Sequence, residues 1–122
     1  MINLHMPLAH IAHGRSGDKG NHANIAVFAY TAAGYDWLRQ HLTPEMVHNY
    51  FATLNLKRVV RYEAANVLGL NFVLHDVLAG GASRSLRVDS QGKTLALALL
   101  QMPIRPGEHV DAMLRLKTKE QA

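Results

Sequence analysis

The sequence predicts an α+β fold in which helices cover one face of a mainly antiparallel sheet. Segments rich in β-branched, aromatic or alternating apolar residues come in neighbouring pairs near both ends of the chain, as the strands of antiparallel hairpins do. Segments with helical spacing lie between these pairs, so the strands neither alternate regularly with helices nor form an uninterrupted series. The expected order is β-β-α-α-β-α-β-β, in one domain that spans residues 1–122.

Two strands and a polar loop are expected at the start of the chain. Residues 7–13 (PLAHIAH) look extended, and residues 23–30 (ANIAVFAY) combine β-branched and aromatic side chains. Between them lies a nine-residue polar stretch, Gly14 to His22, that is rich in glycine. Such residues are typical of turns, so we expect a loop at the shared end of two paired strands.

Two helices are expected next. Apolar residues at helical spacing predict a helix over residues 34–42. Thr43-Pro44-Glu45 then marks a new helix start, because a hydroxyl cap, a proline at the first position and an acid in the first turn all favour an N-terminus. The buried face of this second helix is expected to consist of Met46, Val47, Tyr50, Phe51 and Leu54.

A charged strand and a buried helix are expected after these. Residues 57–63 (KRVVRYE) predict a strand near an edge of the sheet, where charged side chains are favoured. Residues 67–78 are apolar around most of a helical circumference, which predicts a well-buried helix. Asn66 would cap the start of this helix, and Gly80-Gly81 would end it.

Two further strands are expected in the last third of the chain, and the tail after them permits a third. Residues 83–89 (SRSLRVD) and 94–102 (TLALALLQM) flank a turn that contains a glycine, and together they predict a hairpin. The second arm also suits a helix, because leucine, alanine and glutamine are good helix formers, but a strand is the preferred interpretation. A last strand is expected over residues 109–116.

The composition narrows the class of protein. The chain has no cysteine, which excludes disulfides and thiolate ligands or nucleophiles. No apolar run reaches the roughly 18 residues of a membrane span, and the N-terminus lacks the pattern of a signal peptide, so we expect a cytoplasmic protein with no membrane partner. A net charge of +4 permits an anionic partner. The basic residues are scattered and aromatic residues do not interleave with them, which argues against nucleic acid.

The stretch Arg15-Ser16-Gly17-Asp18-Lys19-Gly20 concentrates chemically able groups. An arginine offers a planar fork of donors and a lysine a point charge, while glycines let backbone N–H groups approach an anion. We therefore predict that a phosphate or carboxylate binds here. Asp18 and the flanking His13 are the candidate catalytic acid–base groups. The candidate ligand-binding residues are Arg15, Ser16, Gly17, Lys19 and Gly20.

Two other interpretations of this stretch stay open. An ordinary hairpin loop with an internal ion pair, between Asp18 and Arg15 or Lys19, has the same composition. A metal site formed by His13, Asp18 and His22 is the other, although the eight histidines show no His-x-x-x-His pair on one helix. We expect neither a bound metal nor a cofactor.

A second polar cluster lies at Gly80-Gly81-Ala82-Ser83-Arg84-Ser85. It also combines glycines, hydroxyls and an arginine at the boundary of an element, although a helix stop followed by a strand start explains the glycines equally well. The candidate ligand-binding residues of this cluster are Gly80, Gly81, Arg84 and Ser85.

Two segments resemble a known family. Residues 12–27 (AHGRSGDKGNHANIAV) and 71–95 (NFVLHDVLAGGASRSLRVDSQGKTL) are similar to the small C-terminal domain of the acyclic terpene utilisation proteins, the AtuA-like family. That domain occurs fused behind a larger domain or as a separate small protein. The resemblance implies a ferredoxin-like α+β fold, a two-layer sandwich, and it provides no catalytic residues.

The resemblance also implies work beside a larger AtuA-like partner, in the catabolism of acyclic terpenes or other branched acids as coenzyme A thioesters. The leading hypothesis is an accessory subunit whose two polar loops converge on an anionic small molecule, such as a CoA thioester, or on an acidic partner surface. The alternative is a self-sufficient lyase, isomerase or hydratase that uses Asp18 or His13. We also expect a homo-oligomer, since small sheets with apolar edges often pair.

Overall fold

The computed structural model of the protein describes residues 5–19, 22–76 and 93–115. The short 3-10 helices carry the label η. Along the chain, the elements are β1 (Met6–Pro7), η1 (Leu8–His10), β2 (Ala12–Lys19), β3 (His22–Ala29), α1 (Ala32–His41), α2 (Pro44–Tyr50), η2 (Ala52–Leu54), β4 (Arg58–Ala64), η3 (Ala65–Val67), β5 (Gly69–His75), α4 (Lys93–Leu100), β6 (Pro103–Ile104) and η4 (Val110–Ala112).

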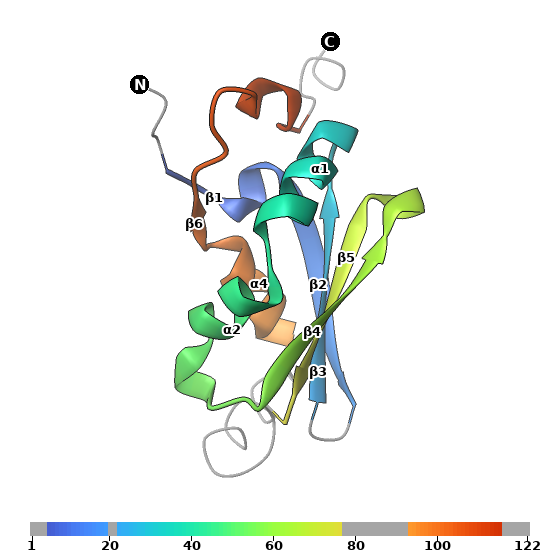
Figure 1. Cartoon of the computed structure of the whole chain (residues 1–122). Coiled ribbons are helices and arrows are strands. Elements are labelled where there is room, and N and C mark those ends of the chain that lie inside the picture. The colour runs from blue at the N-terminus through green and yellow to red at the C-terminus, as the bar shows by residue number, and fades with distance from the viewer. Residues whose placement is uncertain (1–4, 20–21, 77–92, 116–122) are drawn as a thin grey trace.

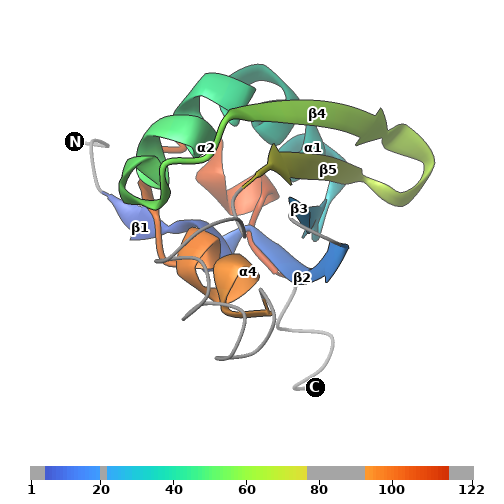
Figure 2. The ribbon, with the colours of Figure 1, turned by 90° about the horizontal axis from the view of Figure 1, so that it is seen from below.

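The main sheet has four antiparallel strands in the order β2-β3-β5-β4. β2 and β3 form one hairpin, β4 and β5 form another, and the hairpins join where β3 pairs with β5. The helices α1, α2 and α4 lie on one face of this sheet, which curves around them (Figures 1 and 2). The predicted α+β class, with helices on one face of an antiparallel sheet, is confirmed.

The connections are those of a ferredoxin-like fold. From β3 the chain passes through α1 and α2 to β4, which runs parallel to β3 with β5 between them, a split β-α-β motif. In the usual ferredoxin-like order, β-α-β-β-α-β, the last strand follows the second helix. Here the corresponding strand, β2, comes first in the chain, before β3, and the second helix of the motif, α4, follows β5. The chain is therefore a circularly rearranged form of that order.

The core lies between the sheet and its helices. Alternate residues of β3 and β5 are buried, as the two-residue period of a strand requires. Phe72, in the middle of β5, is the largest fully buried side chain among the described residues. The inward residues of the two central strands are Ala23, Ile25, Val27, Ala29, Leu70, Phe72 and Leu74.

The first two helices begin at threonine caps. The Thr31 hydroxyl accepts a hydrogen bond from the Gly34 N–H at 3.0 Å, and the Thr43 hydroxyl accepts one from the Met46 N–H at 3.1 Å. The predicted helix start at Thr43 is therefore confirmed. The buried face of α2 is narrower than predicted, because Met46 and Tyr50 are 37% and 38% exposed.

The helix predicted over residues 67–78 is wrong. Residues Gly69–His75 form β5 instead. This strand pairs on both sides, with β3 and β4, so its outward residues are half-buried as well and the segment is apolar at most positions. A run of that kind has no period from which a strand and a buried helix can be told apart. Gly80-Gly81, the predicted end of the helix, lies outside the described residues.

The strand predicted over residues 94–102 is also wrong, and its helical alternative is right. α4 spans Lys93–Leu100 and packs against β2. Leu95 and Leu99, four residues apart, are buried, whereas Leu97 is 64% exposed, as the helical period requires. The preceding arm of the predicted hairpin, residues 83–89, lies outside the described residues.

The segment after α4 is mostly irregular. The last strand predicted over residues 109–116 is wrong in its described part, which contains the 3-10 helix η4. The two-residue strand β6 precedes η4 in the chain. It pairs antiparallel with β1, so that Met6 lies opposite Ile104. The Leu8 N–H also donates to the Met102 carbonyl at 2.9 Å, which ties the start of the fold to its last third.

Candidate functional site

The predicted binding loop is wrong in its secondary structure: most of it is a strand. Residues from Arg15 to Lys19 belong to β2, which pairs residue by residue with β3 from Lys19↔His22 to Ala12↔Ala29. Only residues 20 and 21, which the structure does not describe, separate the two strands. Polar residues and glycines are typical of turns, but here the pairing with β3 outweighs this local preference.

Alternate residues of β2 face the two sides of the sheet, which separates the predicted ligand-binding residues. Ser16 lies opposite the buried Ile25, and its hydroxyl accepts a hydrogen bond at 3.1 Å from the Ala96 N–H in the first turn of α4. This contact fixes the start of α4 against the sheet. Arg15 and His13 are exposed, on the face away from the helices.

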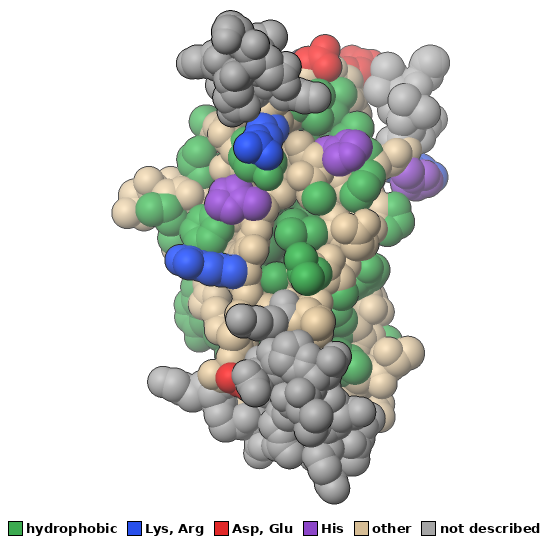
Figure 3. All heavy atoms as spheres, turned by 180° about the vertical axis from the view of Figure 1, so that it is seen from behind, with side chains coloured by type: hydrophobic (Ala, Val, Ile, Leu, Met, Phe, Trp, Pro, Cys, Tyr) green, Lys and Arg blue, Asp and Glu red, His purple; other side chains and the backbone are tan. Residues whose placement is uncertain are grey.

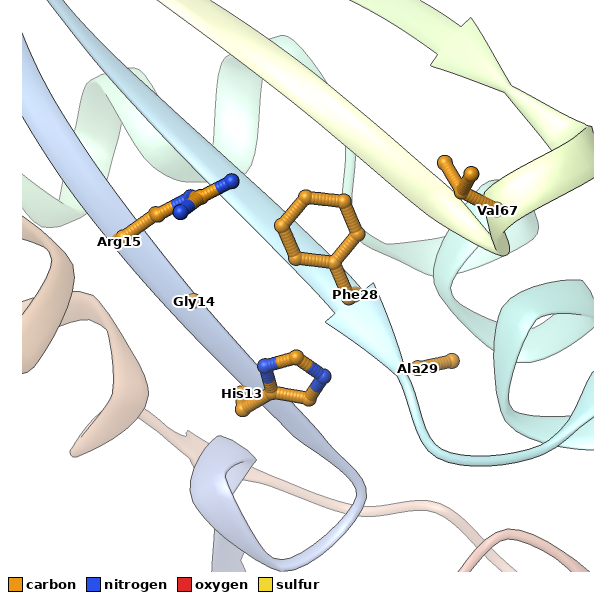
Figure 4. Close-up of a pocket in the computed structure, with 6 residues that line it drawn as sticks. All are labelled: His13, Gly14, Arg15, Phe28, Ala29 and Val67. Carbon is orange, nitrogen blue, oxygen red and sulfur yellow. The ribbon is translucent and has the colours of Figure 1, made fainter.

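A pocket lies on this open face where β2 and β3 pair. It has a volume of about 420 Å³ and is lined by His13, Gly14, Arg15, Phe28, Ala29 and Val67. Figure 4 shows His13 and Arg15 projecting from β2 on either side of Gly14, with the Phe28 ring next to them on β3 and Val67 across the pocket. The pocket therefore combines an apolar floor with a guanidinium and an imidazole.

Three aromatic rings line up beside this pocket. The His13 ring stacks on Phe28 at a centroid distance of 5.4 Å and on Tyr30 at 5.2 Å. The Arg115 guanidinium lies 5.6 Å from the centre of the Tyr30 ring, within the range of a cation–π contact. In the view from behind, Figure 3 shows basic and histidine side chains among hydrophobic ones over the upper part of the molecule.

The two predicted catalytic residues do not share a site. His13 and Asp18 are five residues apart on one continuous strand, which corresponds to about 16 Å. Asp18 is exposed at the far end of β2, where it lines a second pocket of about 320 Å³ with His22, Ala23, Asn24 and Val73. A single reacting atom cannot lie within hydrogen-bond distance of both groups.

The second pocket adjoins a cluster of histidines that the sequence did not indicate. The His22 and His75 rings make an edge contact at 4.8 Å, and Nδ1 of His22 accepts a hydrogen bond from the Asp76 N–H at 3.1 Å. Arg58 lies opposite His75 in the sheet. Desolvation, Arg58 and His22 lower the pKa of His75 from its ordinary value of 6.5, against the opposing effect of Asp76.

The lowered pKa of His75 predicts that the protein becomes more stable as the pH rises towards 6.5. Between its native pKa and 6.5, His75 binds fewer protons in the folded chain than in the unfolded chain, so its contribution to the free energy of unfolding increases with pH. The ring resonances of His75, followed by NMR from pH 4 to 8, are expected to titrate with a midpoint below 6.5. A midpoint at or above that value contradicts the prediction.

A metal at His13, Asp18 and His22 was one interpretation of the sequence. Within residues 5–19, 22–76 and 93–115, no group of three or more histidine and carboxylate side chains is arranged to hold a metal ion. None of the helices in these same segments is both long and apolar enough to cross a membrane. The second predicted cluster, with Gly80, Gly81, Arg84 and Ser85, lies outside the described residues, as does Gly20.

Phe28 and Val67 complete the first pocket, and the sequence analysis did not select either of them. For Phe28 a signal exists: in ANIAVFAY it alternates with the buried Ile25 and Val27, so it belongs to the outward face of its strand. Val67 is 50% exposed in η3, at the turn between β4 and β5. It reaches the pocket only through the pairing of the two hairpins, which no local pattern reveals.

Comparison with protein families identifies the class of domain. The family model described as the AtuA ferredoxin-like domain matches residues 6–105. These limits coincide closely with the paired strands β1 and β6. No curated protein and no solved structure matches the chain.

Proposed function

The chain belongs to the family of AtuA ferredoxin-like domains, and from this premise we propose that it is an accessory subunit of a larger AtuA-like protein in the catabolism of acyl-CoA compounds. Acyclic terpene acids and other branched acids are the proposed class of acyl group. In this role the chain binds an anionic ligand, or an acidic surface of its partner, through Arg15.

One observation carries the proposal: Arg15 is an exposed cation beside a preformed pocket. Within the described part of the chain, no carboxylate lies within ion-pair distance of its guanidinium, whereas Arg39 and Arg61 each have one. A guanidinium forms bidentate, charge-assisted hydrogen bonds with phosphate or carboxylate. An uncompensated arginine at a pocket is therefore suited to recruit an anion.

The edge position of β2 supports a role in assembly. β2 is one of the two outer strands of the sheet, so one side of its backbone has no neighbouring strand among the described elements. An outer strand can take part in contacts with another chain. A self-sufficient hydratase, lyase or isomerase that uses Asp18 or His13 is the alternative; the two residues line separate pockets, so such an enzyme would use one of them and not both.

The proposal predicts that Arg15→Ala weakens binding of the larger protein or its acyl-CoA ligand by about tenfold to a hundredfold, the usual loss for a charge-assisted hydrogen bond. The tagged chain is purified from its native host, and proteins that accompany it in constant ratio are identified. Their affinity for the wild type and for Arg15→Ala is then compared.

Arg39→Ala serves as the matched control, because Arg39 is exposed on α1 and its described ion pair is with Asp36, one turn away. Its loss is expected to leave the affinity unchanged. Recovery of the chain with itself alone under mild conditions rejects the accessory-subunit role. Equal binding by the Arg15 variant, the Arg39 variant and the wild type rejects the assignment of Arg15.

A further inference from the structure

The Phe28 ring lies flat against the sheet rather than pointing away from it. A Cβ atom placed on Gly69 would lie 2.8 Å and 3.0 Å from two carbons of this ring, so the ring occupies the space that a side chain at residue 69 would take. Phe28 and Gly69 are direct cross-strand partners. The side of the ring that carries these two carbons thus lies over Gly69 of β5, and the ring lines the pocket.

The aromatic surface extends beyond this one ring. The His13 ring is inclined by 28° to the Phe28 ring and by 29° to the Tyr30 ring, so the three rings lie next to one another at similar tilts. Val67, half exposed at the rim, offers a further apolar contact across the pocket. A planar heterocycle such as a purine has the width to cover Phe28 and part of His13, and stacking on aromatic side chains is how proteins commonly hold bases.

Arg15 lies on the same strand as His13, two residues further along, and therefore on the same face. In Figure 4 its guanidinium extends beside the Phe28 ring. A ring bound on Phe28 and an anionic group bound by Arg15 would be neighbours, as the base and the phosphate of a nucleotide are. The volume of about 420 Å³ lies within the range of sites that bind small molecules.

We propose that this pocket binds the nucleotide moiety of a phosphorylated ligand, with the base stacked on Phe28 and a phosphate held by Arg15. The inference rests on the proposed function, and it names the class of anion that Arg15 recognises. A nucleotide of this kind occurs free in the cell and also as one end of coenzyme A. The acyl end of an acyl-CoA would then remain accessible to a partner.

The proposal is tested with the full chain and five probes: AMP, adenosine, inorganic phosphate, coenzyme A and pantetheine. Binding is measured by calorimetry and mapped by the NMR signals of the Phe28 and His13 rings. AMP is expected to bind at least tenfold more tightly than adenosine or phosphate, because only AMP contacts both Phe28 and Arg15. Coenzyme A binding tenfold more tightly than AMP assigns the site to the coenzyme, and equal affinities assign it to the free nucleotide.

Variants separate stacking from charge. Phe28→Leu is expected to weaken AMP binding by roughly five- to a hundredfold, the range for loss of one base–aromatic stack, while Phe28→Tyr, which keeps the ring, stays near the wild type. Arg15→Lys loses the planar fork and is expected to lose about tenfold. Arg58→Ala is the matched control, because Arg58 is an exposed cation on the same face of the sheet, at the end far from the pocket. This variant is expected to bind AMP normally.

Several outcomes overturn the proposal. Pantetheine that binds as tightly as coenzyme A, or phosphate that binds as tightly as AMP, shows that no base is recognised. An affinity for adenylate oligomers that rises with every added nucleotide identifies a nucleic-acid surface instead. Circular dichroism checks the fold of Phe28→Leu. If that variant is unfolded, Arg15→Ala decides, and unchanged AMP binding in Arg15→Ala contradicts the phosphate contact.

The experiments distinguish rejection of the nucleotide site from rejection of the accessory-subunit role. If Phe28→Leu retains the larger partner in constant ratio but AMP and coenzyme A do not bind the wild type, only the nucleotide site is rejected. If the nucleotides bind but no larger protein accompanies the chain, the accessory role is rejected and the nucleotide site stands.

Discussion

Replacing Phe72 by alanine is expected to lower the free energy of unfolding by about 3–5 kcal/mol, the usual cost of truncating a buried phenylalanine. Phe72 is fully buried in the middle of β5, opposite Ile25 on one side and Arg61 on the other. Its loss leaves a cavity in the core between the sheet and the helices that cover it. Domains of this size have about 5–15 kcal/mol of stability in total, so the variant should be near its unfolding limit.

The measurement is urea denaturation followed by circular dichroism, with Val73→Ala as the matched control. Val73 is the next residue on the same strand and faces the opposite, open side, where it is only half-buried. Its truncation is expected to cost about 1 kcal/mol or less. Similar losses for both variants would contradict the strand, because a two-residue period requires the two neighbours to differ.

Gly14→Ala is expected to lower the free energy of unfolding by about 1–3 kcal/mol, the range for inserting a group into a packed site. A Cβ atom at Gly14 would lie only 2.6 Å from the backbone carbonyl oxygen of Ala26 on β3. A carbonyl in a strand pair cannot rotate away as a side chain does. The variant would therefore force β2 and β3 apart beside the pocket at His13 and Arg15.

Gly17→Ala is the control for this prediction, because Gly17 belongs to the same strand and hairpin. A Cβ atom there meets nothing closer than the Asn24 side-chain oxygen at 3.6 Å, which is an ordinary contact. We expect this variant to be neutral, or more stable by about 0.5 kcal/mol, since alanine restricts the unfolded chain more than glycine does. The free energies of unfolding of the two variants are compared by urea denaturation under the same conditions. Equal values would contradict the close approach of β3 to Gly14.

Local signals predicted much of the fold. The strands expected over residues 23–30 and 57–63 and the helix over 34–42 agree with β3, β4 and α1 to within two residues at each end. Thr43 caps α2 as expected, because a hydroxyl cap, a proline and an acid act within one turn and need no distant partner. The edge position of β4 also follows from its charged side chains, since a strand at the edge has a side open to solvent.

The errors have a common physical cause, which is that tertiary pairing outweighed local preference. Residues 69–75 are apolar at most positions because β5 is central in the sheet, and that pattern also suits a buried helix. Residues 94–100 carry helix formers that also alternate, so the sequence permitted both interpretations. The family resemblance was the more dependable guide to the fold, and the match over residues 6–105 confirms it.

The candidate site was predictable in composition but not in shape. Arg15 and His13 were selected for their chemistry, and both line the first pocket. The turn-like glycines hid the strand on which they lie, so Asp18 was grouped with His13 although strand geometry separates them. Convergence of this strand with Gly80–Ser85 stays a prediction, as do the larger partner and self-association.

The short pairing of β1 with β6 has a consequence for how this domain can be tethered. The matched domain begins at residue 6 and ends at residue 105, and Met6 lies directly opposite Ile104. Both limits of the domain therefore lie next to each other, beside the helical layer rather than the open face (Figure 1). A neighbouring chain joined at either limit would start from the same anchor. A linker of a given length would then give the neighbouring domain the same effective concentration at this domain, whether it is fused before residue 6 or after residue 105.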